Sequence, residues 1–321
     1  NKHNNSDIAM GHIVIDILSV LCFIASSNAF YHGYAMRNLR IRTGLRVEAE
    51  NLSAILTERF PTSVEDQIRQ ASESLKRASQ DGYHRHSVRL LLPLLAPTDL
   101  DDWPGGTRQM AEAAFPLMQT VLRTLGAKQM DLRIVDESDG IGAILAQADD
   151  PKKDSCTVLL PSADTIKTLQ SLEEQVGLSR DMIIVNAQWQ RKSDFGIFGG
   201  RDKRVSYAEK FVPSFYCSNF MVEGEQVRIL RTYPGPWKVY LRSEENSKVN
   251  WSQIGEKPVL EEKPATWDTD PANLRDGGRL FDFGKPAYRE VETMIKSQDG
   301  FAPKSIAERA SAAFSFIKDT L

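Results

Sequence analysis

Short apolar runs of strand length alternate with helix-like segments between about residue 62 and residue 185 of this chain. The run Met182–Val185 is continuously apolar and β-branched, as expected of a strand that is buried on both faces. The segment Ile166–Val176 instead repeats apolar residues at helical spacing. Because strands that alternate with helices favour a parallel sheet, we expect an α/β fold with three layers and a mostly parallel central sheet.

The pattern in this region predicts four strands and three helices. The expected strands are Ser87–Leu95, Leu132–Val135, Cys156–Leu160 and Met182–Val185. The first helix follows Thr62, the second covers Met110–Leu122 and the third is Ile166–Val176. Pro116 lies inside the second helix, where it predicts a kink or a restart.

The pattern changes after about residue 210, where strand-like runs follow one another directly. Glu223-Gly224-Glu225 is a hairpin signal between the runs Phe215–Val222 and Gln226–Thr232, and Trp237–Leu241 reads as a further strand. We therefore expect an antiparallel C-terminal extension of the sheet. Two helices, around Tyr288–Lys296 and Ser305–Lys318, end the chain.

The first 47 residues have the pattern of a targeting segment. Ile13–Ala25 is apolar but shorter than a membrane span, and Ser27-Asn28-Ala29 fits a signal-peptidase site before Phe30. The residues from Phe30 to Val47 contain four arginines and no acidic residue, which is typical of transit peptides. This order resembles the bipartite plastid presequence of algae with complex plastids. A secreted protein with a basic start, or a membrane anchor, remains the alternative.

Residues 48–321 are accordingly expected to form a single α/β domain in a plastid, in the stroma or at the stromal face of the thylakoid. The formal net charge of the whole chain is -3, which gives no basic field for nucleic acid. No transmembrane helix is expected in this part of the chain. Cys156 and Cys217 lie in apolar runs and are interpreted as inert core thiols.

Polar residues follow the expected strands, and in a parallel sheet they would share the rim where ligands bind. Together with two glycines before a helix, they form a hypothetical ligand site of Asp101, Asp102, Gly105, Gly106, Asp136, Asp164, Asn186 and Gln188. Carboxylates in this position could hold Mg²⁺ or carry protons. The interpretation that we favour is plainer: Asp and Asn cap helices and shape turns after strands.

Motifs of nucleotide binding and nucleophilic catalysis are absent from the sequence. No phosphate-loop pattern, no dinucleotide fingerprint after a strand and no G-x-S-x-G elbow occurs. His84 and His86 are the only histidines after residue 47. The sequence therefore predicts no catalytic residue, no metal and no cofactor, and it favours a protein that is not an enzyme.

Large aromatic residues in loops and at strand ends are a further lead. Such rings either fill the core or meet a partner, and core packing is the simpler outcome for each ring alone. The hypothetical partner contacts are Trp103, Trp189, Tyr233 and Trp237.

Three segments together resemble the plant and algal family of "domain of unknown function 1995". They are residues 101–106 (DDWPGG), Asn186-Ala187-Gln188-Trp189 and residues 231–237 (RTYPGPW), within a stretch from about Pro61 to Leu241. The resemblance implies a plastid location and a role in photosystem II assembly. It also implies photosystem II subunits or assembly factors as partners, at most a peripheral contact with the thylakoid membrane, and no established catalytic residue.

Two functions follow as expectations. The first is a non-catalytic plastid factor that assists the assembly or accumulation of photosystem II through protein contacts. The second is a nucleotide- or sugar-phosphate-binding α/β domain, or a Mg²⁺-dependent enzyme that uses the rim of Asp and Asn residues. The resemblance supports the second as well, because the domain also occurs fused to a plastid adenylate kinase. A purely structural domain is the weakest alternative.

Overall fold

The computed structural model describes residues 59–92, 106–136, 141–189, 192–196, 199–245, 248–259 and 285–320. The chain divides into two compact units, Asn1–Ser53 and Ala54–Leu321, and all described residues belong to the second. The expected targeting segment, residues 1–47, lies outside the described residues.

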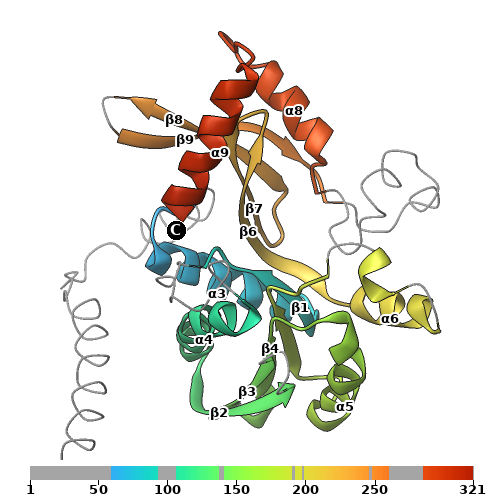
Figure 1. Cartoon of the computed structure of the whole chain (residues 1–321). Helices are drawn as coiled ribbons and strands as arrows, with labels where there is room; N and C mark the ends of the chain where they lie inside the picture. The colour runs from blue at the N-terminus through green and yellow to red at the C-terminus, as the bar shows by residue number, and fades with distance from the viewer. Residues whose placement is uncertain are drawn as a thin grey trace, which may run out of the picture. The chain divides into compact units, whose positions relative to one another are not determined.

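The described part combines six α-helices with nine strands (Figure 1). The helices are α3 (Val64–Gln80), α4 (Thr107–Thr124), α5 (Ile166–Val176), α6 (Arg201–Ala208), α8 (Tyr288–Lys296) and α9 (Ile306–Thr320). The strands are β1 (Arg85–Arg89), β2 (Ala127–Asp136), β3 (Ile141–Ala148), β4 (Ser155–Leu159), β5 (Asp181–Val185), β6 (Val212–Val222), β7 (Glu225–Thr232), β8 (Trp237–Glu245) and β9 (Lys248–Lys257). Helix α4 continues through Pro116 without a restart.

All nine strands form one sheet in the order β2-β3-β4-β5-β1-β6-β7-β8-β9. Only the pairs β4–β5, β5–β1 and β1–β6 are parallel. The other five described pairs are antiparallel. The α/β class is thus confirmed, but the expected mostly parallel sheet is wrong: a parallel centre of four strands is flanked by antiparallel strands on both sides.

Strand β3 explains this difference from the expected topology. It follows β2 after four residues, and so short a connection permits only an antiparallel neighbour, because a parallel crossover needs a dozen residues or more. The sequence of β3, IGAILAQA, contains a glycine and three alanines, which have weak strand propensity. The pattern therefore gave no strand there, and β2 was expected to join the parallel set.

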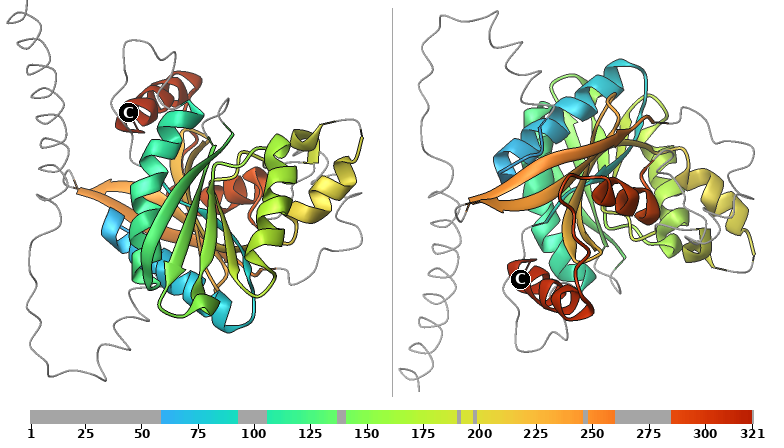
Figure 2. Two further views of the ribbon diagram at one scale, coloured as in Figure 1. Left: turned by 90° about the horizontal axis from the view of Figure 1, so that it is seen from below. Right: turned by 90° about the horizontal axis from the view of Figure 1, so that it is seen from above.

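Helices cover both faces of the sheet, so the three expected layers are present (Figure 2). Helices α3 and α4 pack with alternate strand residues such as Val88 and Phe215 in one hydrophobic cluster. On the opposite face, α5 and α6 cover β3, β4 and β5. Helix α8 covers β6, β7 and β8 on this second face through Val291 and Ile295. The centre of the second face, over β1 and β6, lies between these two groups of helices.

The antiparallel C-terminal part agrees with the expectation from the sequence. Glu223 and Gly224 turn the chain between β6 and β7 with positive φ values of 54° and 82°. Helix α9 approaches this turn closely: a Cβ atom on Gly224 would lie 3.1–3.2 Å from atoms of Arg309 and Lys304. Lys304 also donates a hydrogen bond to the carbonyl of Gly224 and pairs with Glu225. Glycine is therefore needed here for its φ and for the contact.

None of the described helices combines the length and the apolar composition that a membrane-spanning segment requires. The two described cysteines, Cys156 and Cys217, are unpaired and buried, and burial raises the pKa of each thiol to about 12. Both thiols are therefore protonated and unreactive at neutral pH, as interpreted from the sequence.

Candidate functional site at the carboxyl ends of the central strands

The carboxyl ends of β4, β5, β1 and β6 meet at one edge of the sheet, where open α/β sheets bind their ligands. The chain leaves β1 toward α4 on one face, and it leaves β5 toward α6 on the other. This reversal between neighbouring strands is a topological switch point. It is the place at which a ligand site is expected first.

Asn186 holds the two strands together at the switch point. Its backbone adopts the left-handed conformation with φ 48°, which Asn tolerates better than most residues. Its Oδ1 accepts a hydrogen bond of 2.7 Å from the N–H of Leu90, and its Nδ2 donates one of 3.0 Å to the carbonyl of Leu90. The amide side chain thus extends the β1–β5 ladder beyond its last regular pair.

Gln188 makes a similar connection between β5 and β4. Its Nε2 donates a 2.8 Å hydrogen bond to the carbonyl of Leu160, and its backbone N–H donates to the carbonyl of Pro161. Leu160 has φ 51°, a strained conformation for a bulky residue. Both predicted amide residues therefore connect and shape the loops of this edge.

The other six predicted rim residues do not join them in a described cluster. Asp164 is exposed in the short 3₁₀-helix Ala163–Thr165, and Gly106 is the exposed N-cap of α4. Asp136 ends β2, which runs in the same direction as β4 but lies two strands away. Asp101, Asp102 and Gly105 lie outside the described residues. Within the described part of the chain, no three His, Cys, Asp or Glu residues gather in a way that would hold a metal ion.

A group of cations surrounds an aromatic ring beside the switch point, on the face between α6 and α8. Arg89 of β1, Tyr216 of β6 and Arg231 of β7 are consecutive cross-strand neighbours. The Arg89 guanidinium carbon lies 5.6 Å from the centre of the Tyr216 ring, and the Lys285 ammonium lies 4.7 Å from it. Arg231 lies 5.5 Å from the ring of Trp237. We call Arg89, Arg231 and Lys285 with Tyr216 the cationic cluster.

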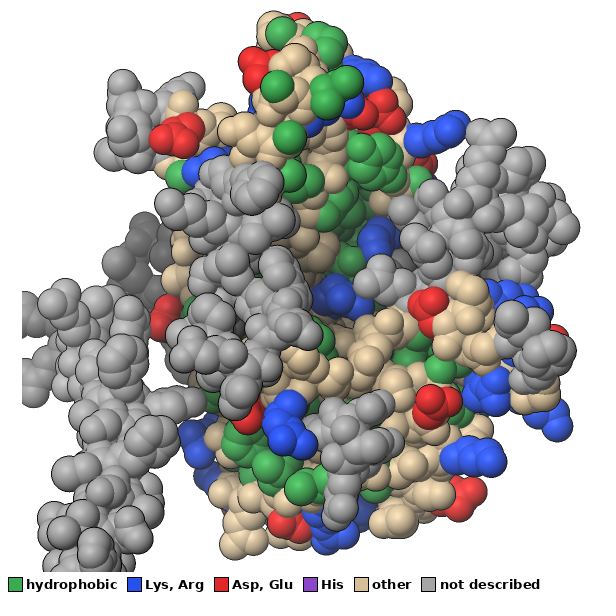
Figure 3. Space-filling view, in the orientation of Figure 1, with side chains coloured by type: hydrophobic (Ala, Val, Ile, Leu, Met, Phe, Trp, Pro, Cys, Tyr) green, Lys and Arg blue, Asp and Glu red, His purple; other side chains and the backbone are tan. Residues whose placement is uncertain are grey.

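The cationic cluster combines burial with access from solvent. Arg231 and Tyr216 are buried, with 3% and 7% of their surfaces exposed, whereas Arg89 and Lys285 are half-buried. Arg89 donates one hydrogen bond of 2.9 Å to the carbonyl of Ala187, next to Asn186. Figure 3 shows Lys and Arg side chains at the bottom of a hollow between the region of α8 and the region of β1 and α6. An anion at this position would meet several positive charges in a partly desolvated environment, which strengthens the attraction.

The sequence did not single out this cluster, because its members come from three strands and from the segment before α8, which lie far apart in the chain. The signals in the sequence were Arg89 within the apolar run Ser87–Leu95 and Arg231 at the start of the segment RTYPGPW.

The aromatic residues predicted as partner contacts are mostly interior. Trp237 is fully buried and packs edge-to-face on Tyr216, and Trp189 packs on Phe195 with 4% of its surface exposed. Tyr233 donates a hydrogen bond of 2.8 Å from its hydroxyl to Asp81; burial and this bond raise its pKa to about 12. The segment RTYPGPW therefore forms the turn from β7 to β8 and anchors it in the core. Trp103 lies outside the described residues.

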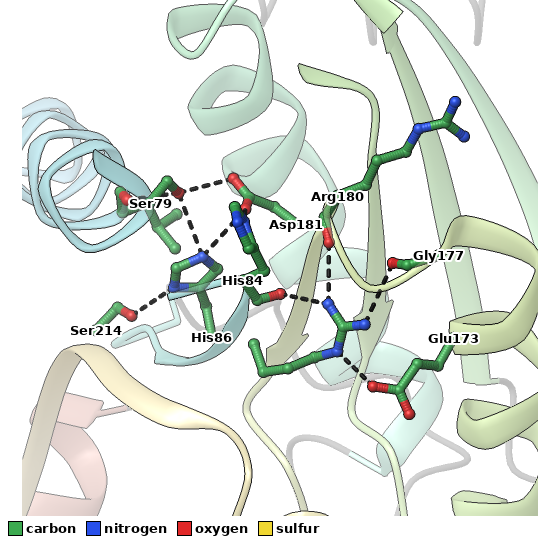
Figure 4. A network of polar contacts seen from close by, with 10 residues as sticks. Ser79, His84, His86, Glu173, Gly177, Arg180, Asp181 and Ser214 are labelled. Atoms are coloured by element: carbon green, nitrogen blue, oxygen red, sulfur yellow. Dashed lines mark hydrogen bonds and ion pairs between the residues drawn. The ribbon is translucent and has the colours of Figure 1, made fainter. Parts of the chain in front are cut away.

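The opposite edge of the central strands holds a polar network that looks more like an enzyme site (Figure 4). His86 Nδ1 lies 2.8 Å from Ser214 Oγ, and His86 Nε2 lies 3.5 Å from Asp181 Oδ1. His84 Nδ1 lies 2.8 Å from the same carboxylate oxygen, and Ser79 donates a 2.7 Å hydrogen bond to Oδ2. The elements joined are α3, β1, β5 and β6.

Only part of this network is closed to substrates. His86 and Ser214 have no exposed surface, so Ser214 could not reach a substrate as a nucleophile. The side chains of His84 and Asp181 are 36% and 29% exposed, so this part of the network borders solvent. Burial alone would raise the pKa of Asp181, but its hydrogen bonds with His86, His84 and Ser79 outweigh burial and lower the pKa to about 2. The carboxylate is thus ionised at neutral pH, and the network serves to connect four elements.

Arg85 completes the same edge. Its Nε pairs with Glu173 Oε1 at 2.5 Å, and its guanidinium donates to the carbonyls of His84, Gly177 and Arg180. The contacts with Glu173, Gly177 and Arg180 tie β1 to the end of α5 and to the start of β5. Arg85 therefore has a structural role.

Comparisons with known proteins place this architecture in a family. The sequence profile described as "Domain of unknown function (DUF1995)" matches residues 61–265, which is more than half of the chain. Searches of the curated proteins and of the solved structures returned no match. The match spans the whole sheet, the switch point and three of the four residues of the cationic cluster. The chain therefore belongs to the family of domain of unknown function 1995.

Proposed function

We propose that this protein is a non-catalytic plastid factor that assists the assembly or accumulation of photosystem II, and that it binds an acidic segment of a client protein in the cationic cluster. The client is a photosystem II subunit or assembly factor. The observation that carries the binding mode is the convergence of Arg89, Arg231 and Lys285 around Tyr216 at the switch point.

The chemistry of the cluster favours carboxylates. Arginine presents a planar fork of N–H donors that matches a carboxylate in two parallel hydrogen bonds. Half-buried cations lose part of their hydration before a partner arrives, so an anionic partner gains more from them than from exposed lysines. An acidic peptide also needs no deep pocket, which fits a shallow hollow between two helices.

The cellular setting of the proposal comes from the sequence. The leader-like residues 1–47 and the likeness to Low Photosystem II Accumulation 3, a plant protein of the same family, support a plastid protein that works in the stroma or at the stromal face of the thylakoid. The family match supports this likeness at the level of the domain.

A pull-down from solubilised thylakoids tests the proposal. The tagged protein from Glu48 onward is compared with the double variant Arg89→Gln/Lys285→Gln and with Lys203→Gln, a control that removes an exposed cation of α6. We expect the unchanged protein and the Lys203→Gln control to enrich photosystem II core subunits or assembly factors. The double variant should lose most of this enrichment, about tenfold. Equal enrichment by all three would show that clients do not bind at the cationic cluster.

The same site supports a second candidate, the binding of a nucleotide or a sugar phosphate. The specific observation is the position of the arginines at the carboxyl edge, where α/β sheets bind phosphates. A thermal-shift titration with inorganic phosphate, ATP and sugar phosphates separates the two candidates. A rise in Tm that Arg89→Gln/Lys285→Gln abolishes, together with no captured thylakoid protein, would favour the small ligand. A Mg²⁺-dependent reaction at the rim has less support, because the amides of Asn186 and Gln188 bind backbone carbonyls.

A further inference from the structure

Strand β2 forms one end of the nine-stranded sheet. Its pairing with β3 is regular from Gln129 to Ile134, with register shifts at both ends. Among the described residues, β3 is the one strand that pairs with β2. One side of β2 therefore presents a row of backbone N–H and C=O groups that can template the addition of another strand.

This edge carries exposed charged residues, and two of its apolar side chains are exposed as well. Leu132 and Ile134 have 50% and 69% of their surfaces exposed. Both line a groove of about 380 Å³ between β2 and α4, with Phe115 on its inner wall and Arg108 and Glu112 at α4. Charges and bulges of this kind protect many natural edge strands from pairing. Between the two register shifts, however, the exposed apolar Leu132 and Ile134 leave a short regular segment that another strand can cover.

We propose that the strand that covers β2 is β2 of a second copy of this protein, paired antiparallel around a two-fold axis at Leu132. The charges of β2 are self-complementary in this register. Asp131 of each copy lies opposite Arg133 of the other, and Leu132 lies opposite Leu132. Met130 lies opposite Ile134, which makes an apolar row on the α4 face.

The charges disfavour the two neighbouring registers. Because opposed residues of two antiparallel strands lie on the same face, the two-fold axis passes through a residue of the strand, and the nearest alternatives to Leu132 are Asp131 and Arg133. A centre at Asp131 or at Arg133 would place two like charges directly opposite each other, which is destabilising. Within one copy, Arg133 Nε pairs with Asp131 Oδ2 at 3.0 Å on an exposed face. The dimer exchanges two such local pairs, one in each copy, for two pairs between the copies.

A foreign strand would not need this symmetry. The two-fold arrangement of acidic and basic positions about Leu132 therefore favours a second copy over another protein. The same axis brings the two apolar grooves together, so that each covers the other's exposed Leu132 and Ile134. The assembly continues the sheet across the axis and removes one of its two edges.

Charge reversal tests the dimer without depending on a single variant. Light scattering on the full chain at micromolar concentration should give a dimer. Asp131→Arg and Arg133→Asp should each raise the dissociation constant about tenfold or more, because each places like charges opposite each other at two positions. An equimolar mixture of the two variants should restore dimers, because every opposing pair is then of opposite charge. This recovery also shows that both variants are folded.

Cross-linking tests the axis. Directly opposed residues of antiparallel strands have Cα atoms about 4.5–5.5 Å apart, within the range of a disulfide. Leu132→Cys should therefore form a disulfide-linked dimer under mild oxidation. Ile134→Cys is the matched control: it is more exposed, but the two copies of residue 134 would be about 13 Å apart at 3.3 Å per residue.

The outcomes decide the proposal. Dimers that the single charge variants weaken and that their mixture restores, with Leu132→Cys cross-linking about tenfold more than Ile134→Cys, establish the pairing. A monomer at all accessible concentrations overturns it. A dimer that the charge variants leave unchanged, or that cross-links equally at both positions, also overturns it, because the interface then lies elsewhere.

Discussion

Arg85 and Arg89 stand at opposite ends of the same short strand, on the same face, and their surroundings differ sharply. Arg85 is buried and binds Glu173 and three carbonyls. Arg89 is half-buried, donates one hydrogen bond to Ala187 and faces the ring of Tyr216. The comparison shows that residue types alone do not locate a site. The edge with histidines, serines and carboxylates uses these polar groups to bind one another, whereas the cationic cluster at the other edge includes half-buried cations.

Arg85→Ala is expected to have the largest effect on stability. The change leaves the Glu173 carboxylate, which has little solvent access, without its cation, and it removes the donor to three carbonyls. We expect a loss of about 3–5 kcal/mol in the free energy of unfolding, measured by urea denaturation. Arg77→Ala is the control, because the exposed pair of Arg77 with Glu73 at 3.9 Å should contribute less than about 1 kcal/mol. Similar losses for both would contradict the assignment of Arg85 to the fold.

A change at Asn186, which lies at the carboxyl edge of the central strands, should have the second-largest effect on stability. Asn186→Ala removes two hydrogen bonds to Leu90 and forces alanine into a left-handed conformation. We expect a loss of about 2–3 kcal/mol. Asn186→Gly loses the same hydrogen bonds without the strain, so it should be more stable than the alanine variant by about 1 kcal/mol. If glycine were the worse of the two, backbone strain would not be a factor at this position.

Asp181, in the polar network at the amino ends of the central strands, should make the stability of the fold sensitive to acid. The pKa of its carboxyl group is about 2 in the folded protein and about 3.9 in an unfolded chain. Because the folded pKa is the lower one, the stabilisation is complete above about pH 4 and is lost as the pH falls toward 2. We expect about 1–2 kcal/mol, with allowance for the partial exposure of the group. Asp181→Asn should lower the free energy of unfolding by this amount at pH 7. It should also weaken the dependence of this free energy on pH between pH 4 and pH 2. An unchanged pH dependence would contradict the assignment.

Arg89→Gln should have the smallest effect on stability, within about 0.5 kcal/mol. The side chain makes one hydrogen bond and one contact with a ring, and glutamine can still donate a hydrogen bond. Its effect should instead be seen in binding, as a weaker thermal shift with an anionic ligand. A destabilisation as large as that of Arg85→Ala would remove the contrast between the two ends of β1.

Local sequence patterns predicted the elements of the fold better than their pairing. The hairpin at Glu223 and Gly224 was readable because turn residues separate two strand-like runs. Strand β3 was not readable, because Ala and Gly dominate it and its burial comes from neighbours on both sides. The error in one strand changed the direction expected for β2 and with it the proportion of parallel pairs.

The candidate site was predicted in part. Asn186 and Gln188 do lie at the carboxyl edge, but their amides bind the backbone of neighbouring loops, which no spacing in the sequence indicates. The cationic cluster could not be predicted, because Arg89, Tyr216 and Arg231 become neighbours only through the register of three strands. Such a register depends on packing over the whole sheet rather than on any local pattern.

The central position of β1 has a consequence for how the chain folds. Arg85 pairs with Met182 and His86 pairs with Val212. The first described strand therefore pairs with strands that lie about a hundred residues or more later in the chain. The pairs β6–β7, β7–β8 and β8–β9, in contrast, join strands that are consecutive in the chain. Contacts between distant segments form slowly, because the entropy of closing a long loop is lost before any contact compensates it. We therefore expect the C-terminal meander to gain protection from hydrogen exchange first during refolding, and the middle of the sheet to close last.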